Sequence, residues 1–207
     1  MPVTVRARKA FVAIVACLTL LAGCTSGGSG SGSKSHPHAL DPATAKLAQQ
    51  AALQPCPTAG KPAAGAKVLP DLTLQCLGGT GSVPLRKLTG TPTVLNFWAT
   101  WCTDCRAEMS ALQQFATAAA GKVRVVGVNS QDLSQKAPLS FLADNKIHFA
   151  SVYDKQGSAG RALGLPGLPV TVLIRADGSI VQVHPAGVTF AALRQLVRQQ
   201  LHVDIRG

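Results

Sequence analysis

Apolar positions along the chain follow two periodicities, which predict an alternation of strands and helices. Short runs of β-branched and aromatic residues between glycine, proline or polar residues are typical of strands, and longer amphipathic stretches with end signals are typical of helices. The predicted strands are residues 72–77, 83–88, 93–99, 123–128, 148–153, 170–174 and 179–184. The predicted helices are residues 102–120, 137–145, 159–163 and 190–201.

The order of these elements predicts the fold class. The first two strands surround a turn at residues 78–82, and the last two turn through Asp177-Gly178, a dipeptide typical of hairpins. Strands that alternate with helices along the chain indicate parallel strands joined by crossover connections. We therefore expect an α/β fold with a mixed central sheet flanked by helices and an N-terminal β-hairpin extension.

The first 23 residues carry the signs of an export signal. Three cationic side chains precede the apolar stretch 11–20, which is too short to span a bilayer comfortably. Residues 21–24 (LAGC) resemble the lipobox of bacterial lipoproteins, which implies a signal peptide at 1–23 and a lipid on Cys24. An uncleaved anchor or a plain secretory signal are the alternatives, and each of the three exports the domain.

The segment after Cys24 predicts a tether. Residues 25–38 are rich in glycine and serine and, as a flexible coil, span about 20 Å. A short helix is expected from Asp41-Pro42 onward. The predicted division is a signal peptide, a lipidated linker with this helix at 24–65, and a folded domain at 66–207, anchored outside the cytoplasm to the cell membrane.

Net charge adds little to this picture. The formal charge of +11 falls to +8 when the three signal-peptide cations are removed. The remaining lysines and arginines are scattered, and export makes nucleic acid an unsuitable partner. A basic face near anionic lipid headgroups is the simpler interpretation.

Cysteine usage points to disulfides. Of six cysteines, Cys17 leaves with the signal and Cys24 takes the lipid, so four remain in an oxidising compartment. For Cys56 and Cys76 we expect a structural disulfide that closes a loop of about 20 residues and contributes about 3 kcal/mol in the chain-entropy model. A second redox relay is the alternative.

The Cys102-x-x-Cys105 pair permits several functions. Haem attachment needs histidine after the second cysteine, where Arg106 stands, and structural zinc needs a second ligand pair. The pair lies where a strand leads into a helix, and a helix N-terminus stabilises a thiolate. Cys102 should therefore be the exposed nucleophile and Cys105 the shielded resolving thiol, with neither metal nor cofactor.

Residues 97–108 (FWATWCTDCRAE) resemble the active-site segment of the thioredoxin superfamily, in particular the TlpA/ResA-like group of membrane-anchored thiol–disulfide oxidoreductases. Residues 167–171 (GLPVT) match the cis-proline loop of that family and residues 174–178 its following hairpin. The similarity covers roughly residues 69–201 and implies a thioredoxin-like fold.

The resemblance implies roles for several residues. Cys102 matches the attacking cysteine and Cys105 the resolving one. Pro169 matches the cis-proline, with Pro166 as the rival position, and the backbone beside it, including Leu168, holds an extended substrate segment.

Two tryptophans flank the cysteine pair. Trp98 is expected in the core and Trp101 at the surface, where it contacts substrate. His148 and His184 are expected to be structural.

Two acidic residues near the pair qualify these roles. Glu108, the one glutamate of the chain, follows Cys105 by three residues; in the ResA-like group a glutamate here tunes proton transfer, and the alternative is a favourable contact with the helix dipole. Asn96 stands where thioredoxins carry a buried aspartate. Asp104 replaces a proline that is frequent in the family and should raise the pKa of Cys102, which makes the pair more reducing unless Arg106 opposes it.

The combined prediction is an exported, lipid-tethered thiol–disulfide oxidoreductase acting on protein substrates. The family implies a reductant, for example in cytochrome c maturation, with a membrane thiol-transfer protein as electron donor, although an oxidant uses the same residues. The alternative is an exported binding protein, such as a chaperone or copper-handling lipoprotein, with an idle dithiol. A peroxidase function is a third option, but the Pro-x-x-x-Thr/Ser context usual for a peroxidatic cysteine is missing before Cys102.

Overall fold

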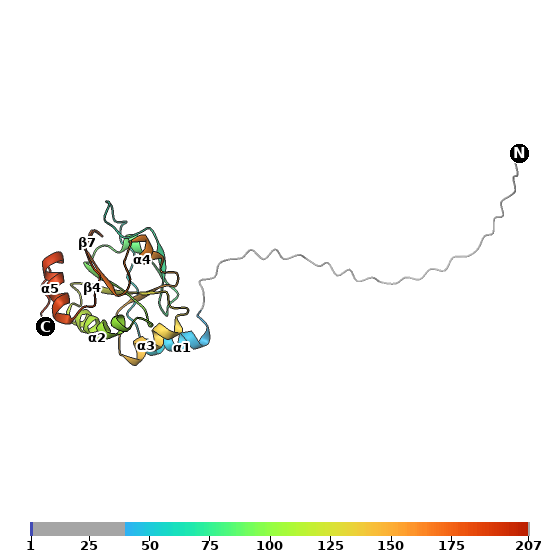
Figure 1. Cartoon of the computed structure of the whole chain (residues 1–207), viewed down its shortest axis with the longest axis horizontal. Helices are drawn as coiled ribbons and strands as arrows, with labels where there is room; N and C mark the ends of the chain where they lie inside the picture. Colours follow the sequence, from blue (N-terminus) through green and yellow to red (C-terminus); the bar gives the residue numbers. More distant parts are fainter. Residues whose placement is uncertain (2–39, 207) are drawn as a thin grey trace, which may run out of the picture. The chain divides into compact units, whose positions relative to one another are not determined.

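The computed structural model describes Met1 and residues 40–206, and the fold is described for residues 40–206 (Figure 1). The predicted signal peptide, the lipidation site Cys24 and the linker at 25–38 lie outside the described residues. None of the helices in the described part combines the length and the apolar character that a membrane crossing needs.

Seven strands form one mixed sheet in the order β2-β1-β5-β4-β3-β6-β7. The strands are β1 (Thr73–Cys76), β2 (Ser82–Pro84), β3 (Thr93–Trp98), β4 (Arg124–Ser130), β5 (Ser151–Asp154), β6 (Val170–Ile174) and β7 (Ile180–His184). The helices are α1 (Pro42–Ala51), α2 (Thr103–Ala118), α3 (Lys136–Asp144), α4 (Ser158–Ala162) and α5 (Phe190–Leu201). Strands β3, β4 and β5 run parallel, and the other pairs are antiparallel. The predicted α/β fold with a thioredoxin-like mixed sheet is confirmed.

Two apolar cores lie on opposite faces of the sheet. Strand β3 divides its side chains between them: Val94 and Trp98 join the core under α1, α2, α3 and α5, whereas Leu95 and Phe97 join the core under α4. This alternation follows from the period of two in a strand, and the burial of all six residues of β3 makes it the centre of the fold. Figure 1 shows α2, α3 and α1 along one side of the sheet and α4 on the other.

The register of β3 and β6 determines where the site forms. Phe97, near the end of β3, pairs with Val170, the first residue of antiparallel β6. The loop that leaves β3 and the loop that enters β6 therefore meet at the same edge of the sheet. Because β4 is parallel to β3, the loop after Ser130 reaches this edge as well.

Two predicted strands were wrong in part. Residues 83–88 form a strand only to Pro84, and a 3-10 turn, η1 (Leu85–Lys87), follows, because proline has no N–H with which to continue the ladder. Residues 148–150 precede β5, since the His148 N–H bonds the Gln113 side chain at 2.8 Å and its ring contacts the Ala51 carbonyl at 2.9 Å.

The segment ahead of residue 66 packs on the sheet domain. Asp41 caps α1 as expected, and Ala51 at its end is fully buried in the core shared with α2 and α3. The Gln54 N–H donates to the His148 carbonyl at 2.6 Å. The boundary at residue 66 remains a prediction, and these contacts attach residues 40–54 to the domain.

Candidate active site

Cys102 and Cys105 lie where β3 gives way to α2. Cys102 is the N-cap residue, and its sulfur accepts a hydrogen bond from the Cys105 N–H at 3.1 Å. The two cysteines form a disulfide with their Cα atoms 5.3 Å apart. Cys102 keeps 8% of its surface exposed and Cys105 none. The order of exposure matches an attacking and a resolving cysteine, roles that stay predictions.

The loop opposite the cysteines contains a cis peptide bond between Leu168 and Pro169, and Pro166 is not in a cis bond. A groove of about 420 Å³ runs between this loop and α2, lined by Asp104, residues 166–170 and residues 185–187. Leu168 is half-buried, and Trp101 keeps 58% of its surface exposed on the neighbouring loop. Trp98, in contrast, is fully buried. The groove is therefore where an extended segment could reach the cysteines.

Glu108 is a buried acid on the same helix as the cysteines. It is 4% exposed, and its carboxylate accepts the Asn96 side-chain amide and the Val188 N–H, each at 2.8 Å. Burial raises the pKa of Glu108 above its ordinary value, and the two hydrogen bonds oppose that rise in part. A carboxyl of this kind can hold or release a proton closer to neutral pH than an exposed glutamate.

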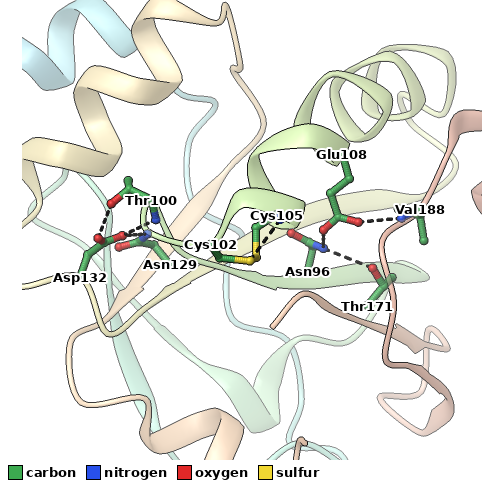
Figure 2. The surroundings of a disulfide bond; sticks show 9 residues. All are labelled: Asn96, Thr100, Cys102, Cys105, Glu108, Asn129, Asp132, Thr171 and Val188. Atoms are coloured by element: carbon green, nitrogen blue, oxygen red, sulfur yellow. Dashed lines mark hydrogen bonds between the residues drawn. A yellow bond between two sulfur atoms is a disulfide. The ribbon is translucent and has the colours of Figure 1, made fainter. Parts of the chain in front are cut away.

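Asn96 connects this acid to the sheet. Its amide nitrogen also donates to the Thr171 hydroxyl at 3.2 Å, across the β3–β6 pair. Figure 2 shows Asn96, Glu108 and Thr171 gathered beside the disulfide. Within residues 40–206, the side-chain oxygen Oδ1 of Asn96 has no hydrogen-bond partner although it is buried. The site thus contains one buried hydrogen-bond acceptor, Asn96 Oδ1, that is unsatisfied.

A second buried acid, Asp132, was missed by sequence reasoning. Its carboxylate accepts the Thr100 N–H at 3.0 Å, the Thr100 hydroxyl, and the Asn129 amide at 2.6 Å (Figure 2). Thr100 is two residues ahead of Cys102, so Asp132 fastens the active-site loop to the end of β4. The available signal was the spacing Asn129-x-x-Asp132 across the end of β4, the strand parallel to β3.

The other cysteine pair is remote from this site. Cys56 and Cys76 form a disulfide with Cα atoms 6.1 Å apart. Cys76 ends β1, and β5 and β4 separate β1 from β3. The bond joins the segment after α1 to the hairpin side of the sheet, as the sequence predicted, and its structural role stays a prediction. Within the described residues, no group of three or more His, Cys, Asp or Glu side chains could hold a metal ion.

Comparisons with known proteins agree with this geometry. A family model described as Redoxin matches residues 63–195. The thiol:disulfide interchange protein DsbE of Escherichia coli is 39% identical over 117 residues, which cover 55% of this chain and 61% of DsbE. The chain thus spans less than two thirds of that relative.

Two further relatives extend the comparison. The thiol-disulfide oxidoreductase ResA of Halalkalibacterium halodurans is 33% identical over 120 residues, covering 58% of this chain and 67% of ResA. The crystal structure of a DsbF homologue from Corynebacterium diphtheriae is 29% identical, with a TM-score of 0.59 over 65% of this chain and 86% of that one. The sequence and the fold point to the same group of proteins.

Proposed function

The chain belongs to the Redoxin family, and we propose that it is an exported, lipid-tethered thiol–disulfide oxidoreductase that acts on protein substrates. One observation carries the proposal: a Cys-x-x-Cys disulfide at a helix N-terminus faces a cis-proline loop, with a buried acid of raised pKa beside it. The names of the relatives DsbE and ResA support the same activity.

The proposed exchange uses both cysteines in turn. In the reduced protein, the Cys102 thiolate attacks one sulfur of a substrate disulfide and releases the other as a thiolate, which leaves a mixed disulfide. The Cys105 thiolate then attacks the Cys102 sulfur and releases the second substrate thiolate. Two electrons pass to the substrate, and the protein is left with the Cys102–Cys105 disulfide that the structure contains.

Each step has a group that assists it. The N–H groups at the start of α2, including that of Cys105, which donates to the Cys102 sulfur, stabilise the Cys102 thiolate. Glu108 accepts the proton that Cys105 gives up before its attack. Pro169, Leu168 and Trp101 hold the substrate segment in the groove.

The proposed setting is the outer side of a cell membrane. Cys24 carries the lipid, residues 25–38 form the tether, and a membrane thiol-transfer protein supplies electrons. The direction of exchange is reductive, as in the maturation of cytochrome c, and the Cys56–Cys76 bond is structural.

The decisive experiment is a redox titration of the mature chain with Cys24 replaced by serine. Equilibration with thiol buffers should give a potential near thioredoxin's, about −270 mV, whereas a value near about −120 mV would indicate an oxidant. Serine is a good N-cap, so Cys102→Ser keeps α2 capped and serves as a folded control without exchange. If the pair does not exchange with thiol buffers, the oxidoreductase function is wrong and the binding-protein hypothesis takes its place.

A further inference from the structure

The groove beside the cysteines has an unusual charge for this chain. Asp104 is the one charged residue that lines it, and its side chain is exposed in the first turn of α2. The other lining residues are prolines, glycines, alanine, leucine and valine from the loops before β6 and after β7. A chain with a formal charge of +11 therefore presents a negative charge where a partner must approach Cys102.

A second carboxyl group lies close to the groove. Glu108 lies behind the wall at Gly187, where an added Cβ would stand 3.8 Å from its carboxylate. Arg161 faces a separate cavity of about 110 Å³ that shares Gly167 and Leu168 with the groove. No positive side chain among the described residues lines the groove. Arg106, which is also exposed, follows Asp104 by two residues in α2, a spacing at which helical side chains do not face each other.

The walls fit an extended polypeptide. In the described residues, the backbone groups of Gly167, Leu168, Ala186 and Gly187 make no backbone–backbone hydrogen bond to another segment. An added Cβ at Gly167 would meet no atom within 4 Å, so that side of the groove is open. Free backbone groups on both walls can pair with a chain laid between them.

We propose that this groove selects partner segments that carry lysine or arginine within a few residues of the reacting cysteine, with Asp104 as the specificity-determining residue. The inference rests on the proposed thiol–disulfide exchange and adds the class of substrate. A cationic side chain beside the cysteine is attracted by Asp104, and an acidic one is repelled.

The test uses two peptide disulfides that differ only in having lysine or glutamate on either side of the cysteines. The reduced mature chain reduces each peptide, and the quantity of interest is the ratio of kcat/KM for the lysine peptide to that for the glutamate peptide. An exposed charge pair corresponds to a ratio of about two to five, which falls as salt is added. Asp104→Asn should bring the ratio close to one.

A matched control isolates the groove from net charge. Asp71→Asn removes the same charge from an exposed position before β1, outside the groove, and should leave the ratio unchanged. Any effect of Asp104 on the reactivity of Cys102 changes both peptides alike and cancels in the ratio.

The outcomes separate the two hypotheses. A ratio above one in the parent and in Asp71→Asn, lost in Asp104→Asn, supports the inference. An equal ratio in all three chains overturns it and leaves the oxidoreductase function standing. If the parent reduces neither peptide, the proposed function fails, and the substrate preference fails with it.

Discussion

The two disulfides of the described residues differ in what surrounds their sulfur atoms. Cys102 and Cys105 are three residues apart at the N-terminus of α2, beside helix N–H donors, a buried acid and an open groove. Cys56 and Cys76 are 20 residues apart and join the segment after α1 to the end of β1. We therefore expect the first bond to exchange with thiols and the second to restrain the chain, because the neighbouring donors and the chain separation differ.

The largest effect on stability should come from removing the remote bond. Cys56→Ser combined with Cys76→Ser should lower the free energy of unfolding by about 3 kcal/mol, because the unfolded chain regains the freedom of a 20-residue loop. Urea unfolding with the other pair kept oxidised measures this loss. The potential of Cys102–Cys105 should not move, and a changed potential would show that the two bonds are coupled as a relay.

A smaller loss of stability should follow from cutting the link between the active-site loop and β4. Asp132→Ala leaves the Thr100 N–H and the Asn129 amide without their acceptor in a buried position, which should cost about 2 kcal/mol. Unlike the remote bond, this change should also slow thiol exchange, because Thr100 fixes the approach to Cys102. Asp144→Ala, an exposed carboxylate on α3, is the control and should alter neither unfolding nor exchange.

The smallest change in stability, about 1 kcal/mol, is expected from Glu108→Gln, which retains one of the two hydrogen bonds to the carboxylate. The raised pKa of Glu108 means that the folded protein holds its proton more tightly than the unfolded chain. Its contribution to stability is complete below the ordinary glutamate pKa and is lost as pH rises through the raised one. Glu108→Gln should therefore flatten this decline, as unfolding at a series of pH values would show.

The same substitution sharpens the comparison between the two bonds. A glutamine cannot take the Cys105 proton, so the pH dependence of exchange at Cys102–Cys105 should lose its step at the pKa of Glu108. The Cys56–Cys76 bond should be unaffected at every pH. An identical pH profile in parent and variant would assign Glu108 to helix stability alone.

Much of the fold was predictable because local sequence patterns, namely apolar runs and helix-capping residues, determine its central elements. The run of β-branched and aromatic residues at 93–98 is buried on both faces, and Asp41 and Thr189 cap their helices with their own side chains. The element boundaries that were predicted wrongly depend on contacts between residues distant in sequence. Residues 148–150 are tied to α1 and α2 by His148, contacts that only the tertiary structure creates.

The candidate site likewise contains residues that local spacing predicts and residues that only the tertiary structure brings together. Cys102, Cys105 and Glu108 lie within seven consecutive residues, so helical spacing alone brings them together. Asp132 acts on Thr100 from 32 residues away, through the parallel pairing of β3 and β4. Apolar and polar periodicity carries no information on which loop residue will accept a hydrogen bond from another loop.

The Cys56–Cys76 bond also decides how the domain would respond to mechanical force. If residues 25–38 tether it to a membrane, tension enters at residue 40 and reaches α1 first. Peeling of that segment stops at Cys56, where the bond transfers the load to the end of β1. Because β5 and β4 stand between β1 and β3, the strand that leads to Cys102 is shielded from the pull. The domain could thus be dragged by its anchor with the geometry of its exchanging pair intact.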